Sequence, residues 1–489
     1  MAARARYGKK ALPTIAMNEE HAELDFDPDM AQTRFGYGRS PLVPGPQDVD
    51  EMVAQLRGTE EPLAGVRFPS DEEMRERISA LMGKRRVFRS AAEGSLERER
   101  LQKQYRAARR AAFQEVAGWT GANLARRVWS RDGLRERLVA FWADHFSAPG
   151  KNERYKYTAP SHVANAVRPY VAGRFEEMLI AAALHPQMLH YLDQSTSIGP
   201  NSPFAKAKPE KYLGLNENLA RELLELHTLG VGGSYTQHDV RQLAELLSGL
   251  TAHPNKGTVY VTKRTEPGSE TVLGKEYGTR RSRISDVESA LRDLARHPDT
   301  ARHLSRKLAV HFVSETPDED LLVSMAARYL ETDGDLAEVV EAMLRHPSSW
   351  HPVAHGSGNF KQPELFVSSA LRALAVPLDQ LLTVRRNRLD QLLGTPLRTM
   401  GQPWRQPIGP DGFSEEDVHW ITAQGMAARL QWALSVPTAL VGDLPDPRAF
   451  VETALGPNAP AAVRFAAGAA ENRREGIALV LMSPGFQRV

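Results

Sequence analysis

The segment 215–240 has the richest set of side chains for chemistry in this sequence. Its periodic leucines predict a helix to Gly230, where glycines end it, and a second helix that begins after a Thr236 N-cap. At about 100° per residue, two carboxylates, an amide and a guanidinium fall on one arc of the first helix. Such a cluster can bind a divalent metal, act as an acid–base pair or hold a ligand. The residues of this arc are Asn218, Arg221, Glu222 and Glu225.

The same arc has an ordinary structural explanation. Glu217, Arg221 and Glu225 lie four residues apart, which is the spacing of weak ion pairs on an exposed helix. On an unbroken helix His227 would point about 200° away from Glu225, so the two are not expected to share a site. The site and the ion-pair interpretations both stay open.

His145 lies on an apolar stripe with Phe141 and Trp142, at the spacing of a buried helix face. A buried imidazole needs a partner for each ring nitrogen. An acid of the arc would supply one, so we expect His145 and Glu222 to meet in space. The alternative is a core histidine bonded to a backbone carbonyl.

The elements that must position these residues are predicted to be mainly α-helical, in a multi-helical orthogonal bundle. Of the 489 residues, 42% are hydrophobic, which is enough to bury a core in each domain. One small β-hairpin excursion is expected, with strands near 257–263 and 271–274. The predicted parts are an extended N-terminal arm (1–68), a helical subdomain that contains the 215–230 helix (69–255), and a helical subdomain with the β-excursion (256–489).

Two stretches of the chain are similar to each other. Residues 173–186 align without a gap on 334–347, with Gly, Glu, Ala, His and Pro coinciding, and each stretch follows a helix that ends in His-Phe, at His145 and His311. An old internal duplication of a helical subdomain would produce this pattern. Capping would produce it too, because His in a last turn favours the helix dipole and Pro just beyond ends the helix.

Composition and missing motifs exclude several classes of protein. The sequence has no cysteine, which removes disulfides, thiolate metal sites and cysteine nucleophiles. It lacks H-E-x-x-H, Walker, G-x-S-x-G and dinucleotide-binding motifs, which argues against metalloproteases, NTPases and dinucleotide-dependent dehydrogenases. The 62 basic and 60 acidic residues are interleaved, so no nucleic-acid partner is expected. No run is long enough for a membrane span and no export signal is visible, which favours a cytoplasmic location; export by a missing signal is the alternative.

Longer motifs carry a resemblance to a known family. The run 216–230, followed by 235–240 and a helix to 249–251, resembles the signature of the bacterial family called domain of unknown function 1800. The resemblance extends from about residue 30 over nearly the whole chain, with one departure at Trp404, where a more apolar continuation is expected. The supporting segments are 34–38, 141–146, 191–193, 301–308, 359–364, 401–403, 410–412 and 483–486.

The resemblance implies a mainly helical bacterial protein with no settled reaction, whose gene often neighbours that of a sulfatase-like protein. Recurring motifs from several helices and loops favour an enzyme with a His/carboxylate site, either with a divalent metal or as a metal-free carboxylate pair, that acts on a polymer such as a polysaccharide or peptide. The alternative is a non-catalytic binding or scaffold protein that partners a sulfatase-like protein. The predicted site residues are catalytic His145, Asp193, Glu222 and Glu225, substrate-binding Asn218, Arg221 and Lys361, and metal ligands His145, Glu222 and Glu225.

Overall fold

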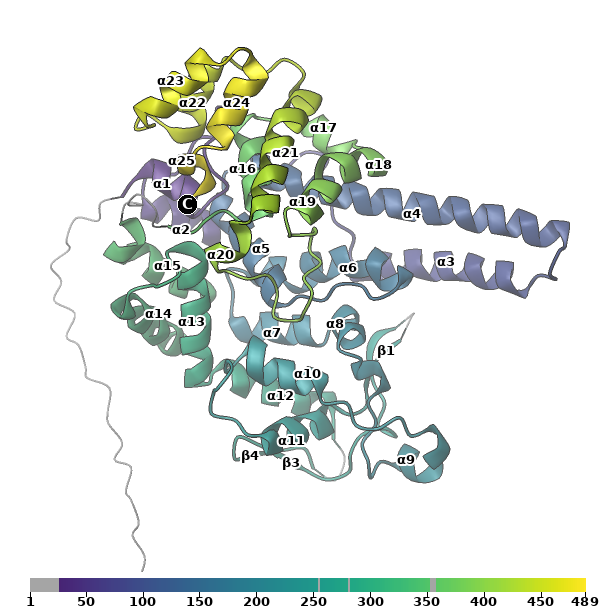
Figure 1. Cartoon of the computed structure of the whole chain (residues 1–489). Coiled ribbons are helices and arrows are strands. Elements are labelled where there is room, and N and C mark those ends of the chain that lie inside the picture. Colours follow the sequence, from purple (N-terminus) through teal and green to yellow (C-terminus); the bar gives the residue numbers. More distant parts are fainter. Residues whose placement is uncertain (1–25, 254–255, 280–281, 352–357) are drawn as a thin grey trace, which may run out of the picture.

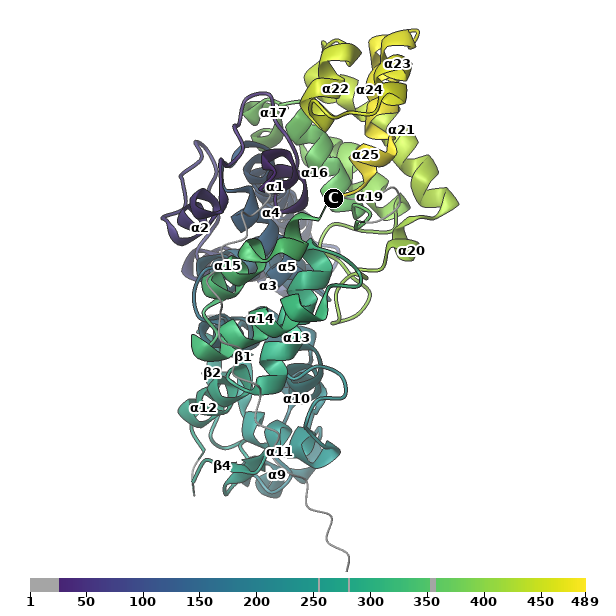
Figure 2. The same cartoon turned by 90° about the vertical axis from the view of Figure 1, so that its left-hand side faces the viewer.

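The computed structural model describes residues 26–253, 256–279, 282–351 and 358–489. The chain is 63% helical, which confirms the prediction of a mainly α-helical fold. The C-terminal helices α22 to α24 lie at one end of the molecule and the segment from α9 to α12 at the other, with α5 between them (Figures 1 and 2). No helix in these described ranges combines the length and apolar character that a membrane crossing requires.

The first hydrophobic core joins segments between residues 31 and 350. At its centre Trp142 of α5 is fully buried and packs against Phe175 of α7, with 5.5 Å between ring centroids. The core takes residues from both sides of residue 255, and the domain division predicted there stays a prediction. Its helices are α1 (Pro28–Arg34), α2 (Val49–Arg57), α5 (Gly133–His145), α7 (Phe175–Ala183), α8 (Pro186–Tyr191), α10 (Asn218–Glu222), α11 (Gln237–Leu247), α12 (Ile284–Ala295), α13 (Pro298–Phe312), α14 (Glu319–Glu331) and α15 (Leu336–Arg345).

Two further cores flank the first. A second core packs the end of α4 against the C-terminal helices, and a third lies inside the long hairpin of α3 and α4, which projects from the body (Figure 1). The helices of these two cores are α3 (Asp71–Ser90), α4 (Leu96–Trp129), α6 (Glu153–Ala166), α16 (Pro363–Ala373), α17 (Leu378–Leu382), α18 (Arg386–Leu389), α19 (Thr395–Thr399), α20 (Asp417–Trp420), α21 (Ala423–Val441), α22 (Pro447–Leu455), α23 (Ala461–Ala469), α24 (Arg473–Leu481) and α25 (Pro484–Gln487). Shorter elements are η1 (Arg168–Tyr170), η2 (Gln194–Thr196), α9 (Pro203–Ala207), η3 (Pro209–Lys211), η4 (Leu223–His227), η5 (Pro347–Trp350) and η6 (Asp390–Gly394).

The described strands form two antiparallel hairpins, where the sequence predicted one excursion. β1 (Leu250–His253) pairs with β2 (Gly257–Tyr260), and β3 (Glu270–Val272) pairs with β4 (Lys275–Tyr277). Leu273 and Gly274 have φ angles of 50° and 76°, and positive φ at both positions is the requirement of a tight two-residue hairpin turn. The segment near 271–274 therefore pairs with its immediate successor instead of with 257–260.

The two similar stretches of the chain begin side by side. The backbone N–H groups of Phe175 in α7 and Leu336 in α15 each donate, at 2.9 Å, to the glycine that precedes the other helix. His185 and His346 each accept a hydrogen bond from the backbone N–H two residues later, so they cap the following helix and not the preceding one. The reciprocal bridge favours a duplication about a pseudo-twofold axis, which stays an interpretation.

Candidate functional site

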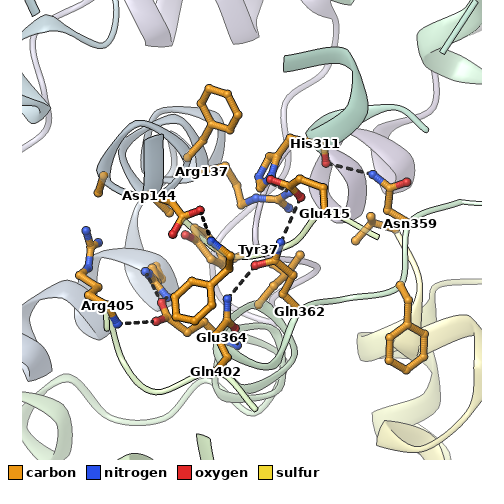
Figure 3. Close-up of a pocket in the computed structure, with 18 of the residues that line it drawn as sticks. Tyr37, Arg137, Asp144, His311, Asn359, Gln362, Glu364, Gln402, Arg405 and Glu415 are labelled. Atoms are coloured by element: carbon orange, nitrogen blue, oxygen red, sulfur yellow. Dashed lines mark hydrogen bonds and ion pairs between the residues drawn. The ribbon is translucent and has the colours of Figure 1, made fainter. Parts of the chain in front are cut away.

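A cavity of about 80 Å³ lies where α5, the C-terminal end of α13, the segment 358–365 and the loop 401–416 meet. We call it the central pocket; Figure 3 shows its side chains converging from these elements. Three of the contributing segments, 141–146, 359–364 and 401–403, carry family motifs. The polar side chains that line the pocket include Tyr37, Arg127, Arg137, Asp144, His311, Asn359, Gln362, Glu364, Gln402, Arg405 and Glu415.

Asp144, in the last turn of α5, faces the loop 401–416. Its carboxylate accepts a hydrogen bond from the Phe413 backbone N–H at 2.9 Å. Gly412, at φ +84°, packs so closely that a Cβ there would collide with Oδ2 of Asp144. Burial raises the pKa of Asp144 to about 7, and the neighbouring carboxylates of Glu415 and Glu364 add to the rise. Asp144 can therefore both donate and accept a proton near neutral pH.

Glu415 is a second carboxyl group of the central pocket, and it is ionised. Its carboxylate accepts hydrogen bonds from Nδ1 of His311 at 2.8 Å and from Nε2 of Gln362 at 3.0 Å. Arg137 donates to Nε2 of His311 at 3.2 Å, which places the ring proton on Nδ1, toward Glu415. Burial alone would raise the pKa of Glu415, but His311 and the charge of Lys307 outweigh it and lower the pKa overall. The two carboxyl groups therefore favour different protonation states.

Behind the pocket, His145 and Lys307 form a buried basic pair. Lys307 Nζ donates to Nδ1 of His145 at 3.2 Å, and Nε2 of the same ring donates to the backbone carbonyl of His227 at 3.3 Å. Burial lowers the pKa of Lys307, and the nearby charge of Asp144 opposes that shift. Burial, and then the charge of Lys307, lower the pKa of His145. His145 is thus a neutral core histidine, which donates a hydrogen bond to a backbone carbonyl and accepts one from Lys307.

The predicted metal ligands His145, Glu222 and Glu225 do not come together as one site. Both ring nitrogens of His145 are taken, by Lys307 and by the carbonyl of His227, so the imidazole offers no free lone pair. In the part of the chain that the structure describes, no hydrogen bond or ion pair joins His145 to Glu222, and no group of three His, Asp or Glu side chains could hold a metal ion. The expected meeting of His145 and Glu222 is therefore not supported, and these three side chains, as they are placed, do not fit a metal ion.

The 215–230 helix is not regular. After α10 it continues as the π-helical turn η4, in which the Leu229 N–H bonds to the carbonyl of Leu224, five residues earlier, at 3.0 Å. The prediction of an unbroken α-helix is wrong in this turn. The wider turn buries His227 completely beside His145, with 5.6 Å between ring centroids. Such turns inside helices frequently occur at functional sites.

Arg221 pairs with the acids one helical turn before and after it. Arg221 contacts Glu217 at 3.1 Å and Glu225 at 3.5 Å, which are the predicted ion pairs. Half-buried Glu222 makes no hydrogen bond or ion pair within the described ranges. Burial raises the pKa of Glu222, and the carboxylates of Glu225 and Asp411 add to the rise. Glu222 thus lies close to the loop that carries Asp411, although it does not line the central pocket.

Three other predicted site residues also lie outside the central pocket. Asp193 pairs with Lys151 at 2.7 Å on the surface, and Asn218 is exposed at the start of α10. Lys361 is only 2% exposed, and its Nζ lies 4.2 Å from the ring centroid of Phe486. Burial lowers the pKa of Lys361 to about 7. Lys361 therefore points into the protein, while its neighbours along the chain line the pocket.

Four charged residues in or near the central pocket were not among the predicted site residues: Asp144, Lys307, Glu415 and Arg405. Asp144 directly precedes His145, and Lys307 lies within the motif 301–308, so the motifs pointed to both segments. Glu415 and Arg405 lie in an irregular loop, where no periodicity indicates which side chains turn inward.

Replacing Gly412 by Ala should destabilise the protein more than the same change at Gly442. Both glycines have positive φ, +84° and +77°, but a Cβ at Gly442 meets open space, whereas at Gly412 it meets the carboxylate of Asp144. We expect the G412A variant to lose about 1 kcal/mol more free energy of unfolding than G442A, because the loop must shift. Urea unfolding followed by circular dichroism would show this difference; equal losses would contradict the contact with Asp144.

The family model described as protein of unknown function (DUF1800) matches residues 30–488. No curated protein and no solved structure matches the chain. Because the family match covers nearly the whole chain, the protein belongs to the DUF1800 family.

Proposed function

We propose that the central pocket is the active site of an enzyme that uses general acid–base catalysis, with Asp144 as the group that carries the proton. The observation that supports this is the position of Asp144. Its side chain faces the cavity that ionised Glu415 also lines, and its pKa is raised to about 7. A group transfers protons best when its pKa lies near the working pH. Carboxyl groups whose surroundings separate their pKa values are typical acid–base pairs.

The other side chains would position and stabilise the reacting group. Lys307, which His145 holds, places a positive charge near Asp144 and would stabilise an anion formed during the reaction. Gln402 donates to Gln362 at 2.7 Å, so these amides form a fixed polar wall. A cavity of about 80 Å³ admits a reacting group and not a long chain, which favours action on an end or branch of a polysaccharide or peptide.

Several sequence predictions stay proposals beside this one. Catalytic roles for Asp193, Glu222 and Glu225 and substrate binding by Asn218 and Arg221 rest on the sequence, as does the cytoplasmic location. The alternative function, a non-catalytic scaffold that partners a sulfatase-like protein, rests on the family resemblance. In that case the side chains of the pocket form a structural network, and no function requires the protonated form of Asp144.

The titration of Asp144 tests the proposed function. We label aspartate carboxyl carbons with ¹³C and compare the spectra of the native chain and the D144N variant. One signal, absent from D144N, should titrate at about pH 7. The D443N variant is the control, since Asp443 has a 94% exposed side chain, and it should keep that signal. A pKa below about 5 for Asp144, near the ordinary value, would exclude it as the proton carrier.

The pH dependence of the protein's stability gives a second measurement of the pKa of Asp144. The folded pKa of Asp144 is raised to about 7, above the ordinary value of about 3.9. Its contribution to stability is therefore complete below about pH 4 and is lost as the pH rises through 7. The free energy of unfolding of the native chain should therefore fall over this pH range, and D144N should lack this fall.

A further inference from the structure

Arg405 lies between the central pocket and a second cavity of about 340 Å³, and it lines both. Its Nε and Nη1 atoms are shielded from solvent and have no hydrogen-bond partner in the described ranges. Its backbone N–H donates to Glu364 at 3.1 Å, which holds the residue at a left-handed φ of 47° (Figure 3). Buried N–H groups normally have hydrogen-bond acceptors, so the oxygens of a ligand would supply the acceptors that this guanidinium lacks.

The second cavity combines aromatic rings with positive charge. Phe113 and Trp404 are among its aromatic side chains, and the exposed cations Lys156 and Arg386 lie on its wall. None of the described residues that line it is acidic. His162 also lines this cavity, but burial lowers its pKa to about 3, so its ring is neutral and adds no positive charge. The cavity is therefore suited to an anion that also presents an apolar face.

We propose that the second cavity binds the body of the substrate, a ring compound that carries a carboxylate, and that Arg405 holds the carboxylate. An arginine fork matches a carboxylate with two parallel hydrogen bonds, and aromatic side chains cover the apolar face of a ring. The two cavities share Ala143, Ser147 and Arg405, so the carboxylate held by Arg405 would lie where the two cavities adjoin.

This inference deepens the proposed function and rests on it for the identity of the reacting end, which would lie at Asp144. Two kinds of ligand share the chemistry, an acidic sugar and an aromatic carboxylate. The test below measures binding and needs no turnover, so it separates the two proposals.

Calorimetric titration of the full chain with two matched pairs of probes tests the binding. The first pair is trigalacturonate and its methyl ester; the second is phenylacetate and phenylacetamide. In one pair the anion should bind at least about 10-fold more tightly than its neutral partner, and that pair identifies the ligand class. The R405Q variant should lose this preference. The R388Q variant should keep it, because Arg388 is an exposed arginine that lines neither cavity.

Two results would overturn the inference. One is a native chain that binds neither anion more tightly than its neutral partner, and the other is an unchanged preference in folded R405Q. If R405Q does not fold, the double variant K156Q/R386Q replaces it; this variant should weaken anion binding several-fold, and unchanged binding would count against the proposal. If Asp144 titrates at its ordinary pKa while the native chain keeps the anion preference, only the proposed function is removed.

Discussion

Replacing Glu136 by Gln is expected to lower the free energy of unfolding by about 3 kcal/mol. Glu136 is 3% exposed, and its two carboxylate oxygens each accept a hydrogen bond from Arg168 at 2.8 Å. The neutral amide of the variant leaves the buried guanidinium with Glu60 alone, at 2.7 Å. Breaking a buried pair typically costs about 3 to 5 kcal/mol, and the remaining contact with Glu60 places this case at the lower end.

The control for this variant is E288Q. Glu288 pairs with Arg292 at 3.5 Å on the surface, and its loss should cost less than about 0.5 kcal/mol. Burial alone would raise the pKa of Glu136, but Arg168 outweighs it and lowers the pKa. The stability from this pair is therefore present above about pH 4.3, the ordinary glutamate pKa, and is lost as the pH falls through the lower folded value. Urea unfolding at pH 7 and pH 3 measures both effects; a loss below about 1 kcal/mol at pH 7, or an equal loss at pH 3, would contradict the prediction.

Helix positions were predictable from the sequence because burial imposes a period on apolar side chains. The predicted Thr236 N-cap forms at the start of α11, where Asp239 completes a capping box. The π-helical turn η4 was not predictable, since the leucine pattern before it fits a regular helix equally well. It depends on tertiary packing around buried His227, which no local pattern encodes.

The motifs identified the right segments of the candidate site but the wrong side chains. Asp144 and His145 are adjacent, so on a helix they point about 100° apart. His145 continues the apolar stripe and faces the core, whereas Asp144 faces the cavity. Lys361 and Gln362 show the same relation on a loop. Which of two neighbours lines a cavity depends on segments far away in the sequence, such as the loop that carries Glu415, which lies 53 residues after Gln362.

The largest effect on activity is expected from Asp144→Asn. Asparagine has nearly the same shape and can still accept the Phe413 N–H bond, which is 2.9 Å in the native chain, so the fold should persist. The amide cannot carry a proton to or from a substrate, and the loss of general acid–base catalysis should reduce kcat by about 10² to 10⁴-fold. KM should change little, because Asp144 is assigned to proton transfer and not to binding.

Because no substrate is assigned, the native chain and D144N are compared on one panel of acidic and neutral oligosaccharides and peptides, with products followed by mass spectrometry. The activity that belongs to the central pocket is the one that D144N loses and D443N keeps. Its kcat in the native chain should also change with an apparent pKa near 7, the value to which burial raises the pKa of Asp144. A rate that rises with pH would make Asp144 the base, and a rate that falls would make it the acid. A panel activity of equal size in both chains would show that its proton transfer takes place without Asp144, and the pocket would lose its catalytic role.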